Sequence, residues 1–99
     1  MRLIDIISKR IDKILESAKN LTFPQILFKL RSATQLSRQQ VCNNLSYSYN
    51  RLFKLENGLL KGRIKKSELK AFSNYYGISW DVLNAKANEF YHKNNGEKA

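Results

Sequence analysis

The most regular hydrophobic pattern of the chain lies near its beginning. Apolar residues recur there at alternating spacings of three and four: Ile4, Ile7, Ile11, Ile14, Ala18 and Leu21. This spacing predicts an amphipathic helix over residues 1–22 with a heptad seam. The seam either covers the core of the helix's own domain or pairs with a second copy of the chain. Attachment to a membrane surface is disfavoured, because acidic residues share the polar face with the lysines.

Two capping boxes predict where the next helices begin. In each, a Ser or Thr is followed three residues later by Gln, with apolar residues just outside the cap and one turn inside it. The pairs are Thr22 with Gln25 and Ser37 with Gln40. Ser48 repeats the cap, and the helix that it starts ends at Asn57-Gly58, where glycine supplies the left-handed conformation that helix ends favour.

Segments 37–45 and 48–56 are therefore expected to be two short helices joined by a tight turn. Each carries an apolar stripe: Val41, Cys42 and Leu45 in the first, Leu52 and Leu55 in the second. Helices this short are not stable alone in water. They must pack at a steep angle within a larger bundle, which is the geometry of a helix-turn-helix motif.

Two more helices complete the predicted architecture. One runs from Ser67 to Tyr76 and ends at Gly77, and the other runs from residue 78 to about Tyr91. The predicted fold class is all-α. The chain divides into an N-terminal amphipathic helix (1–22) for packing or dimerisation, a five-helix helix-turn-helix domain (23–91) and a flexible polar tail (92–99).

A set of short motifs in residues 23–91 points to a known family. They are Leu36-Ser37, Val41-Cys42, Leu45-Ser46-Tyr47-Ser48, Leu52, Leu55-Glu56-Asn57-Gly58, Gly77-Ile78-Ser79 and Asp81-x-Leu83. Together they resemble the lambda-repressor-like (XRE-type) helix-turn-helix family of phage repressors and bacterial regulators. The chain departs from that family at three positions: Arg38 stands where the family most often has Gln, and Gln35 and Ser46 stand where it often has Gly.

The resemblance implies a five-helix DNA-binding domain with one defined ion pair. In the family, the residue matching Arg31 pairs with the Glu at the end of the recognition helix, here Glu56. Glu56 is also the only acidic residue between positions 23 and 66, so a basic partner for it is physically reasonable. From charge alone, Arg31 could equally be a surface arginine that faces a phosphate, and both roles are compatible.

The net charge is concentrated on the same segment. The 99 residues have a formal net charge of +10, and residues 23–66 hold nine basic side chains and one acidic side chain, a net +8. This concentration predicts a polyanionic partner. The single cysteine excludes an internal disulfide, and no run of apolar residues is long enough for a membrane span. We therefore expect a cytoplasmic protein, bacterial or phage-encoded, without a membrane partner.

The helix that starts at Ser48 is the candidate for reading bases. The major groove accepts one α-helix, and residues at its N-terminal end and one turn on reach base edges. Matching positions read bases in the resembled family, and here they are Ser48, Tyr49, Asn50 and Lys54. Asn50 can pair with adenine, Lys54 can donate to guanine, and Tyr49 can contact a thymine methyl or a phosphate. Phe53 could contact DNA, a second subunit or nothing.

Other residues are candidates for contacts to the DNA backbone. Helix N-termini attract anions, and the start of the preceding helix offers Ser37, Arg38 and Gln39. Arg51 lies close to the backbone or to a base. The loop after Gly58 adds attraction that does not depend on sequence, through Lys61, Arg63, Lys65 and Lys66.

Catalytic and metal-binding functions are disfavoured. The only histidine, His92, lies near the end of the chain, so no histidine-based dyad is available. Cys42 fits a small buried position between helices. No metal-ligand spacing and no phosphate-binding glycine motif occurs in the sequence. We expect no enzymatic activity, no cofactor, no metal and no small-molecule substrate.

Two functions from different classes remain. The first is sequence-specific binding of double-stranded DNA by a transcriptional regulator, most simply a homodimeric repressor or autoregulator. The second is a protein-binding module, such as an antitoxin or accessory component that holds a second protein through the Ile-rich helix or the last helix. The two are compatible with each other, and the charge distribution favours DNA binding.

Overall fold

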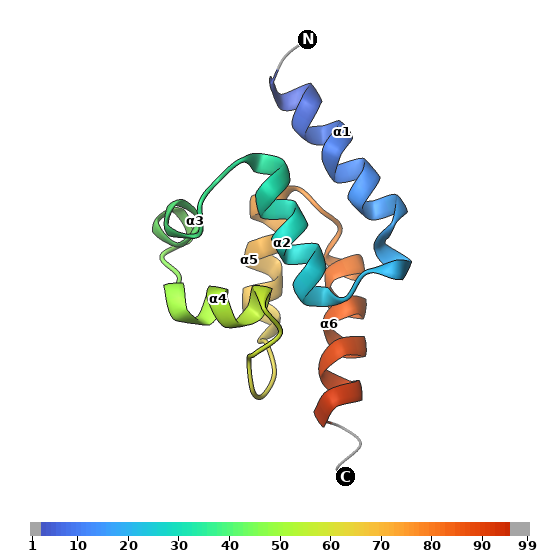
Figure 1. Cartoon of the computed structure of the whole chain (residues 1–99), viewed down its shortest axis with the longest axis vertical. Helices are drawn as coiled ribbons and strands as arrows, with labels where there is room; N and C mark the ends of the chain where they lie inside the picture. Colours follow the sequence, from blue (N-terminus) through green and yellow to red (C-terminus); the bar gives the residue numbers. More distant parts are fainter. Residues whose placement is uncertain (1–2, 96–99) are drawn as a thin grey trace.

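The chain is helical throughout its regular structure. A computed structural model describes residues 3–95, with side chains described for residues 9–91. This part forms six α-helices and one short 3-10 turn, with no strand among the described residues (Figure 1). The elements are α1 (Leu3–Glu16), η1 (Ala18–Asn20), α2 (Phe23–Thr34), α3 (Arg38–Leu45), α4 (Tyr49–Glu56), α5 (Lys66–Tyr76) and α6 (Trp80–Asn95). The predicted all-α class is confirmed.

Helix α2 lies at the centre of the fold. α1 packs along one side of it, and α4 and α6 pack on others (Figure 1). α3 packs against α4, and α5 packs against α6. The side chains that fill the space between them include the fully buried Phe23, Leu27, Leu30, Leu52, Leu55, Phe72 and Leu83. Because α2, α4, α5 and α6 all contribute to this one core, the position of α4 depends on its neighbours.

The capping boxes expected at Thr22 and Ser37 are confirmed. Thr22 Oγ1 accepts a hydrogen bond from the backbone N–H of Gln25 (3.4 Å), and Gln25 Oε1 accepts one from the backbone N–H of Thr22 (2.9 Å). Ser37 and Gln40 make the same two contacts at 3.1 and 2.8 Å. Ser48 caps α4 by accepting a hydrogen bond from a backbone N–H of its first turn. Local sequence therefore sets where α2, α3 and α4 begin.

The start of α5 differs from the prediction. The helix begins at Lys66 instead of Ser67, and Lys65 is its N-cap residue. Glu68 Oε1 accepts the hydrogen bond of the Lys65 backbone N–H (2.9 Å), so the cap comes from an acidic side chain inside the first turn. As a result, Lys65 and Lys66 stand at a helix start and not within the preceding loop.

The end of α6 also differs from the prediction. The helix continues to Asn95 instead of ending near Tyr91, so residues 92–95 of the expected tail are helical. No Gly or Pro interrupts the sequence before Gly96, so nothing in it forces an earlier end. The rest of the expected tail, residues 96–99, lies outside the described residues.

Helix α1 packs against its own domain through the second half of its apolar seam. Ile11 is buried in the core, and Ile14 is half-buried against it. Arg10 Nη1 also donates to the carbonyl of Ala33 in α2 (3.4 Å). The first half of α1 extends beyond the other helices (Figure 1). The side chains of two residues expected at a dimer contact, Ile4 and Ile7, lie outside the described residues.

Two residues that end helices hold a left-handed backbone conformation although they are not glycine. Gln35, after α2, has φ +61°, and Ser46, after α3, has φ +53°. In this region a side chain with a Cβ atom crowds the neighbouring carbonyl, whereas glycine does not. Both positions are ones at which the resembled family often has Gly.

Ser46→Gly should therefore raise the free energy of unfolding by up to about 1 kcal/mol, after allowance for the greater freedom of glycine in the unfolded chain. Ser46→Ala keeps the Cβ atom and is the matched control, which should not be stabilised. Urea denaturation followed by circular dichroism measures both. Equal stability of the two variants would contradict backbone strain at this position.

Candidate nucleic-acid interface

Helix α4 has one buried face and one exposed face. Leu52 and Leu55 are fully buried and attach the helix to the core. Helical periodicity places the other side chains on the opposite face, and the exposed residues there and at the N-cap are Ser48, Tyr49, Asn50, Phe53 and Lys54. The two aromatic side chains on this face are 44% and 41% exposed. The four residues expected to read bases therefore share one exposed surface, with Phe53 between them.

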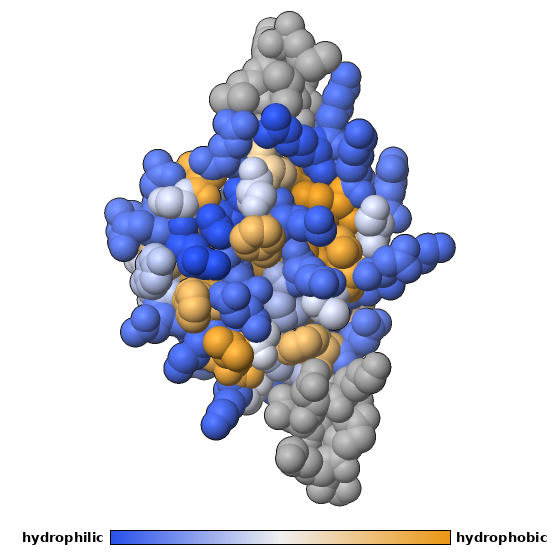
Figure 2. All heavy atoms as spheres, viewed as in Figure 1, coloured by the Kyte–Doolittle hydropathy of each residue, from blue (hydrophilic) through white to orange (hydrophobic). Residues whose placement is uncertain are grey.

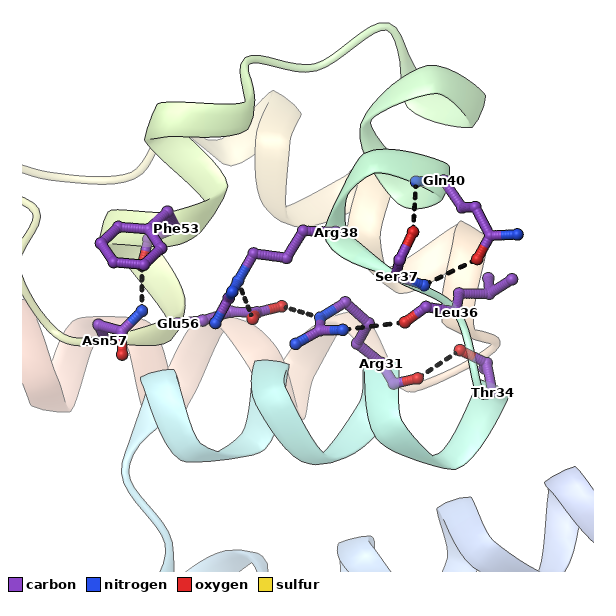
Figure 3. Close-up of polar contacts among 9 residues, drawn as sticks. All are labelled: Arg31, Thr34, Leu36, Ser37, Arg38, Gln40, Phe53, Glu56 and Asn57. Carbon is purple, nitrogen blue, oxygen red and sulfur yellow. Dashed lines mark hydrogen bonds and ion pairs between the residues drawn. The ribbon is translucent and has the colours of Figure 1, made fainter.

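The last turn of α4 is held by a buried carboxylate between two arginines (Figure 3). Glu56 Oε2 accepts a hydrogen bond from Arg31 Nε (2.8 Å), and Glu56 Oε1 accepts one from Arg38 Nε (2.9 Å). The side chain of Glu56 is only 1% exposed. Arg31 belongs to α2 and Arg38 to α3, so a single carboxylate connects three helices. Two cationic partners offset the cost of burying this charge.

Each arginine of this cluster also lies over an exposed phenylalanine ring. Arg31 Cζ lies 5.4 Å from the ring centre of Phe28, and Arg38 Cζ lies 5.1 Å from that of Phe53. Arg31 uses a second nitrogen inside the protein, because its Nη1 donates to the carbonyl of Leu36 (2.9 Å). Within the described residues, the terminal nitrogens of Arg38 have no acceptor. The family resemblance predicted Arg31 beside the carboxylate, whereas Arg38 was not predicted as its second partner.

The other edge of α4 is attached to α5 through Arg51. Arg51 Nε and Nη2 donate to the two carboxylate oxygens of Glu68 at 2.5 and 2.8 Å. The hydroxyl of Tyr47 donates to the same carboxylate. Arg51 was expected to contact DNA. In the structure its Nε and Nη2 make this contact between helices, while its side chain is 32% exposed, so the contact to DNA stays a prediction. Glu68 was not among the predicted residues, and the available signal was only an acidic residue in the first turn of a helix.

This contact shifts the pKa values of its members. Burial raises the pKa of the Tyr47 hydroxyl, and its hydrogen bond to the Glu68 carboxylate raises it further. Burial alone would raise the pKa of the Glu68 carboxyl group as well. The hydrogen bonds from Arg51 and Tyr47 outweigh that effect, so the pKa of Glu68 is lowered. The ionised form of Glu68 is thus favoured in the folded state.

The start of α3 lies along one edge of the exposed face of α4. The contact between Arg38 and Glu56 brings the two together. Ser37 is exposed while it caps α3, and Gln39 is exposed with its Nε2 donating to Asn43 Oδ1 (3.0 Å). The expected phosphate contacts of α3 are therefore close to the C-terminal end of α4.

The cationic loop lies along the other edge. Arg51 Nη2 is 3.5 Å from the carbonyl oxygen of Arg63, which brings the loop beside α4. Ile64 is buried and anchors the loop in the core. Four cationic side chains of the loop and of the start of α5 are exposed and pair with no acidic side chain in the described part: Lys61, Arg63, Lys65 and Lys66. The exposed face of α4 is thus bordered by positive charge that is not neutralised by the protein.

The surface over α2, α3 and α4 is mostly hydrophilic. Figure 2 shows this face, with smaller hydrophobic areas between the polar side chains. Nucleic-acid interfaces are more polar and more positively charged than protein–protein interfaces, which agrees with this surface. Across the described residues, the helices are too short or too polar to cross a membrane.

The remaining candidates for reactive or metal-binding groups were Cys42 and His92. Cys42 is a buried free cysteine, and burial raises the pKa of its thiol, with a further contribution from the charge of Glu56. A raised pKa disfavours the nucleophilic thiolate. No cluster of three or more metal-ligand side chains occurs among the described residues. The side chain of His92 lies outside them.

Comparisons with protein-family models, curated proteins and solved structures gave no match to this chain.

Glu56→Gln should lower the free energy of unfolding by about 2 kcal/mol or more, because it removes the negative charge between two arginines in a buried site. Glu89→Gln is the matched control. Glu89 is 67% exposed and lies 3.6 Å from Lys86, so its loss should cost less than about 0.5 kcal/mol. Urea denaturation measures both, and equal effects would show that the Glu56 cluster adds no more than a surface pair.

The lowered pKa of Glu68 makes stability depend on pH in the acid range. The stabilisation is complete above the ordinary Glu pKa of about 4.3 and is lost as the pH falls toward the lower pKa of the folded state, because the unfolded chain then binds more protons. Glu68→Gln should be less stable at pH 7 and should lose less stability between pH 5 and pH 3. Urea denaturation across this range tests it. An unchanged pH profile in the variant would exclude Glu68 as the titrating group.

Proposed function

We propose that this chain is a sequence-specific double-stranded DNA-binding protein, a transcriptional regulator with a lambda-repressor-like helix-turn-helix fold. The observation that carries the proposal is the exposed face of α4, held by arginine–carboxylate contacts at both edges and bordered by unneutralised cationic side chains. A single helix presented in this way suits the width of the major groove. In this proposal α2–α6 correspond to the five helices of the resembled family.

The readers of base sequence in this proposal are Ser48, Tyr49, Asn50 and Lys54. Asn50 would offer its amide to adenine, and Lys54 would donate to guanine O6 or N7. Tyr49 would contact a thymine methyl group or a phosphate. Their common exposure on α4 supports this assignment, as does the burial of Glu56, which keeps the one carboxylate of α4 itself away from that face.

The backbone contacts come from both edges of α4. Ser37, Arg38 and Gln39 would meet phosphates at the start of α3, and Lys61, Arg63, Lys65 and Lys66 would do so along the loop and the start of α5. The helix starts contribute backbone N–H groups in addition to side chains. Arg51 has a second part in this scheme: besides its expected contact to the DNA backbone, it holds α4 against α5 through Glu68.

The proposal includes a homodimer on a two-fold symmetric site, with half-sites about 10–10.5 bp apart. The described side chains of the α1 seam, Ile11 and Ile14, pack on their own domain. A contact between two copies through the rest of this seam stays a prediction. Footprinting that found a single unrepeated half-site would exclude the dimer while leaving DNA binding intact.

Selection from a random duplex library tests the proposal directly. The protein should enrich one sequence motif and should bind it more tightly than a scrambled duplex at the same salt concentration. Equal binding to all duplexes would contradict sequence specificity. The absence of binding to any duplex would contradict the proposed function as a whole.

Variants on α4 and at the start of α5 should affect DNA binding in different ways. Asn50→Ala and Lys54→Ala should each cost roughly 1–3 kcal/mol on the selected duplex and should reduce its advantage over a scrambled one. Lys65→Ala should weaken binding to both duplexes alike and make the salt dependence shallower by about one unit. The measurement is affinity against salt concentration on both duplexes. If Asn50→Ala and Lys65→Ala gave the same pattern, the assignment of readers would be wrong.

A further inference from the structure

Two arginines lie beside the C-terminal end of α4, one from α2 and one from α3. They have the same kinds of neighbours but make different hydrogen bonds. Arg31 and Arg38 each donate through Nε to Glu56, and each lies over a phenylalanine ring. Arg31 also donates through Nη1 to the backbone, and its side chain is 13% exposed. Arg38 makes only the Nε contact within the described residues, and its side chain is 22% exposed. Arg31 thus uses two guanidinium nitrogens, Nε and Nη1, in contacts within the protein. Arg38 uses Nε alone, which leaves both of its terminal nitrogens for an acceptor outside the described residues.

We infer that Phe53 and Glu56 are positioning residues for Arg38, which they hold ready to bind a DNA phosphate beside the major groove. This inference rests on the proposed function. A guanidinium group is planar and has donors on more than one edge. Glu56 accepts a hydrogen bond on the Nε side of Arg38, and the centre of the Phe53 ring lies 5.1 Å from Arg38 Cζ (Figure 3). The two terminal nitrogens form the fork that recognises phosphate oxygens.

The charges of the cluster support this assignment. Arg31 and Glu56 neutralise each other in a contact of 2.8 Å, so the two arginines and one carboxylate together keep a net charge of +1. A phosphate can neutralise that charge. Holding the guanidinium in place beforehand reduces the side-chain freedom that would be lost when DNA binds.

The same arrangement accounts for the exposed ring of Phe53. The side chain of Phe53 is 41% exposed on the face of α4 that is proposed to read bases. A phenyl ring has no donor or acceptor for hydrogen bonds to base edges. Instead, the ring holds the guanidinium group of Arg38 in place, and Arg38 makes the contact to DNA. Phe53 also lies on the same face of α4 as Asn50 and Lys54, so Arg38 borders the base-reading residues.

The test is a double-mutant cycle on the selected duplex, with Phe53→Leu, Arg38→Gln and both changes together. Phe53→Leu should weaken binding about two- to fivefold, the range expected for loss of an exposed cation–π contact. The loss should be equal on selected and scrambled duplexes, because phosphate contacts carry no sequence information. Arg38→Gln should also make the salt dependence shallower by about one unit. In the Arg38→Gln background, Phe53→Leu should have no further effect.

Two further variants separate positioning from a purely structural role. Phe53→Trp should restore the affinity lost in Phe53→Leu, because indole provides the best ring for a cation. Phe28→Leu is the matched control: it removes the ring under Arg31, whose nitrogens are used inside the protein, and should leave DNA affinity unchanged. Thermal unfolding confirms that each variant is folded. If Arg38→Gln does not fold, Arg38→Lys, which keeps a cation beside Glu56 but lacks the planar guanidinium fork, takes its place in the cycle.

The outcomes separate a failure of the Arg38 inference from a failure of the proposed DNA binding. An equal loss from Phe53→Leu with and without Arg38 would show that the ring acts independently of the arginine, which would overturn this inference alone. A similar loss from Phe28→Leu would overturn it too. Unchanged affinity in Arg38→Gln would show that Arg38 binds no phosphate. If the unmodified protein binds no duplex, the proposed function fails and this inference fails with it.

Discussion

The buried carboxylate of Glu56 is the interaction on which the arrangement of the helices around α4 depends. It accepts hydrogen bonds from α2 through Arg31 and from α3 through Arg38. α3 and α4 have eight residues each, too few to be stable by helix propensity alone. A charge inside the protein must keep its partners, because the loss of either arginine would leave it poorly compensated. This requirement fixes the end of α4 relative to two other helices.

A second ion pair, in which α4 supplies the cation instead of the carboxylate, fixes the other edge of α4. Here α4 supplies the cation, Arg51, and α5 supplies the carboxylate, Glu68. With Leu52 and Leu55 in the core, the helix is held along its buried side and at both edges. Only one face is left for other contacts. The rigidity of that face is what a DNA-reading helix would need, since base recognition depends on accurate placement of a few side chains.

The distribution of positive charge follows from the same contacts. Arg31 and Arg51 are engaged with carboxylates, so they add little to the field outside the protein. The exposed cations of the loop and of the start of α5 are not neutralised in this way. The basic character of residues 23–66 thus divides into a structural part that joins helices and a surface part that is available to a polyanion.

Local sequence determined much of this protein. The helix class, the starts of α2, α3 and α4 and the apolar faces of α3 and α4 could be predicted, because caps and periodicity act between residues three or four positions apart. The pair of Arg31 and Glu56 was expected from resemblance and not from spacing. The partners of Arg38 and Arg51 were decided only by the tertiary structure. They lie 18 and 17 residues away on other helices, and the sequence shows the charges but not which of them packing brings together. For the same reason, only the folded chain shows which nitrogens of these arginines are used between helices and which have no acceptor among the described residues.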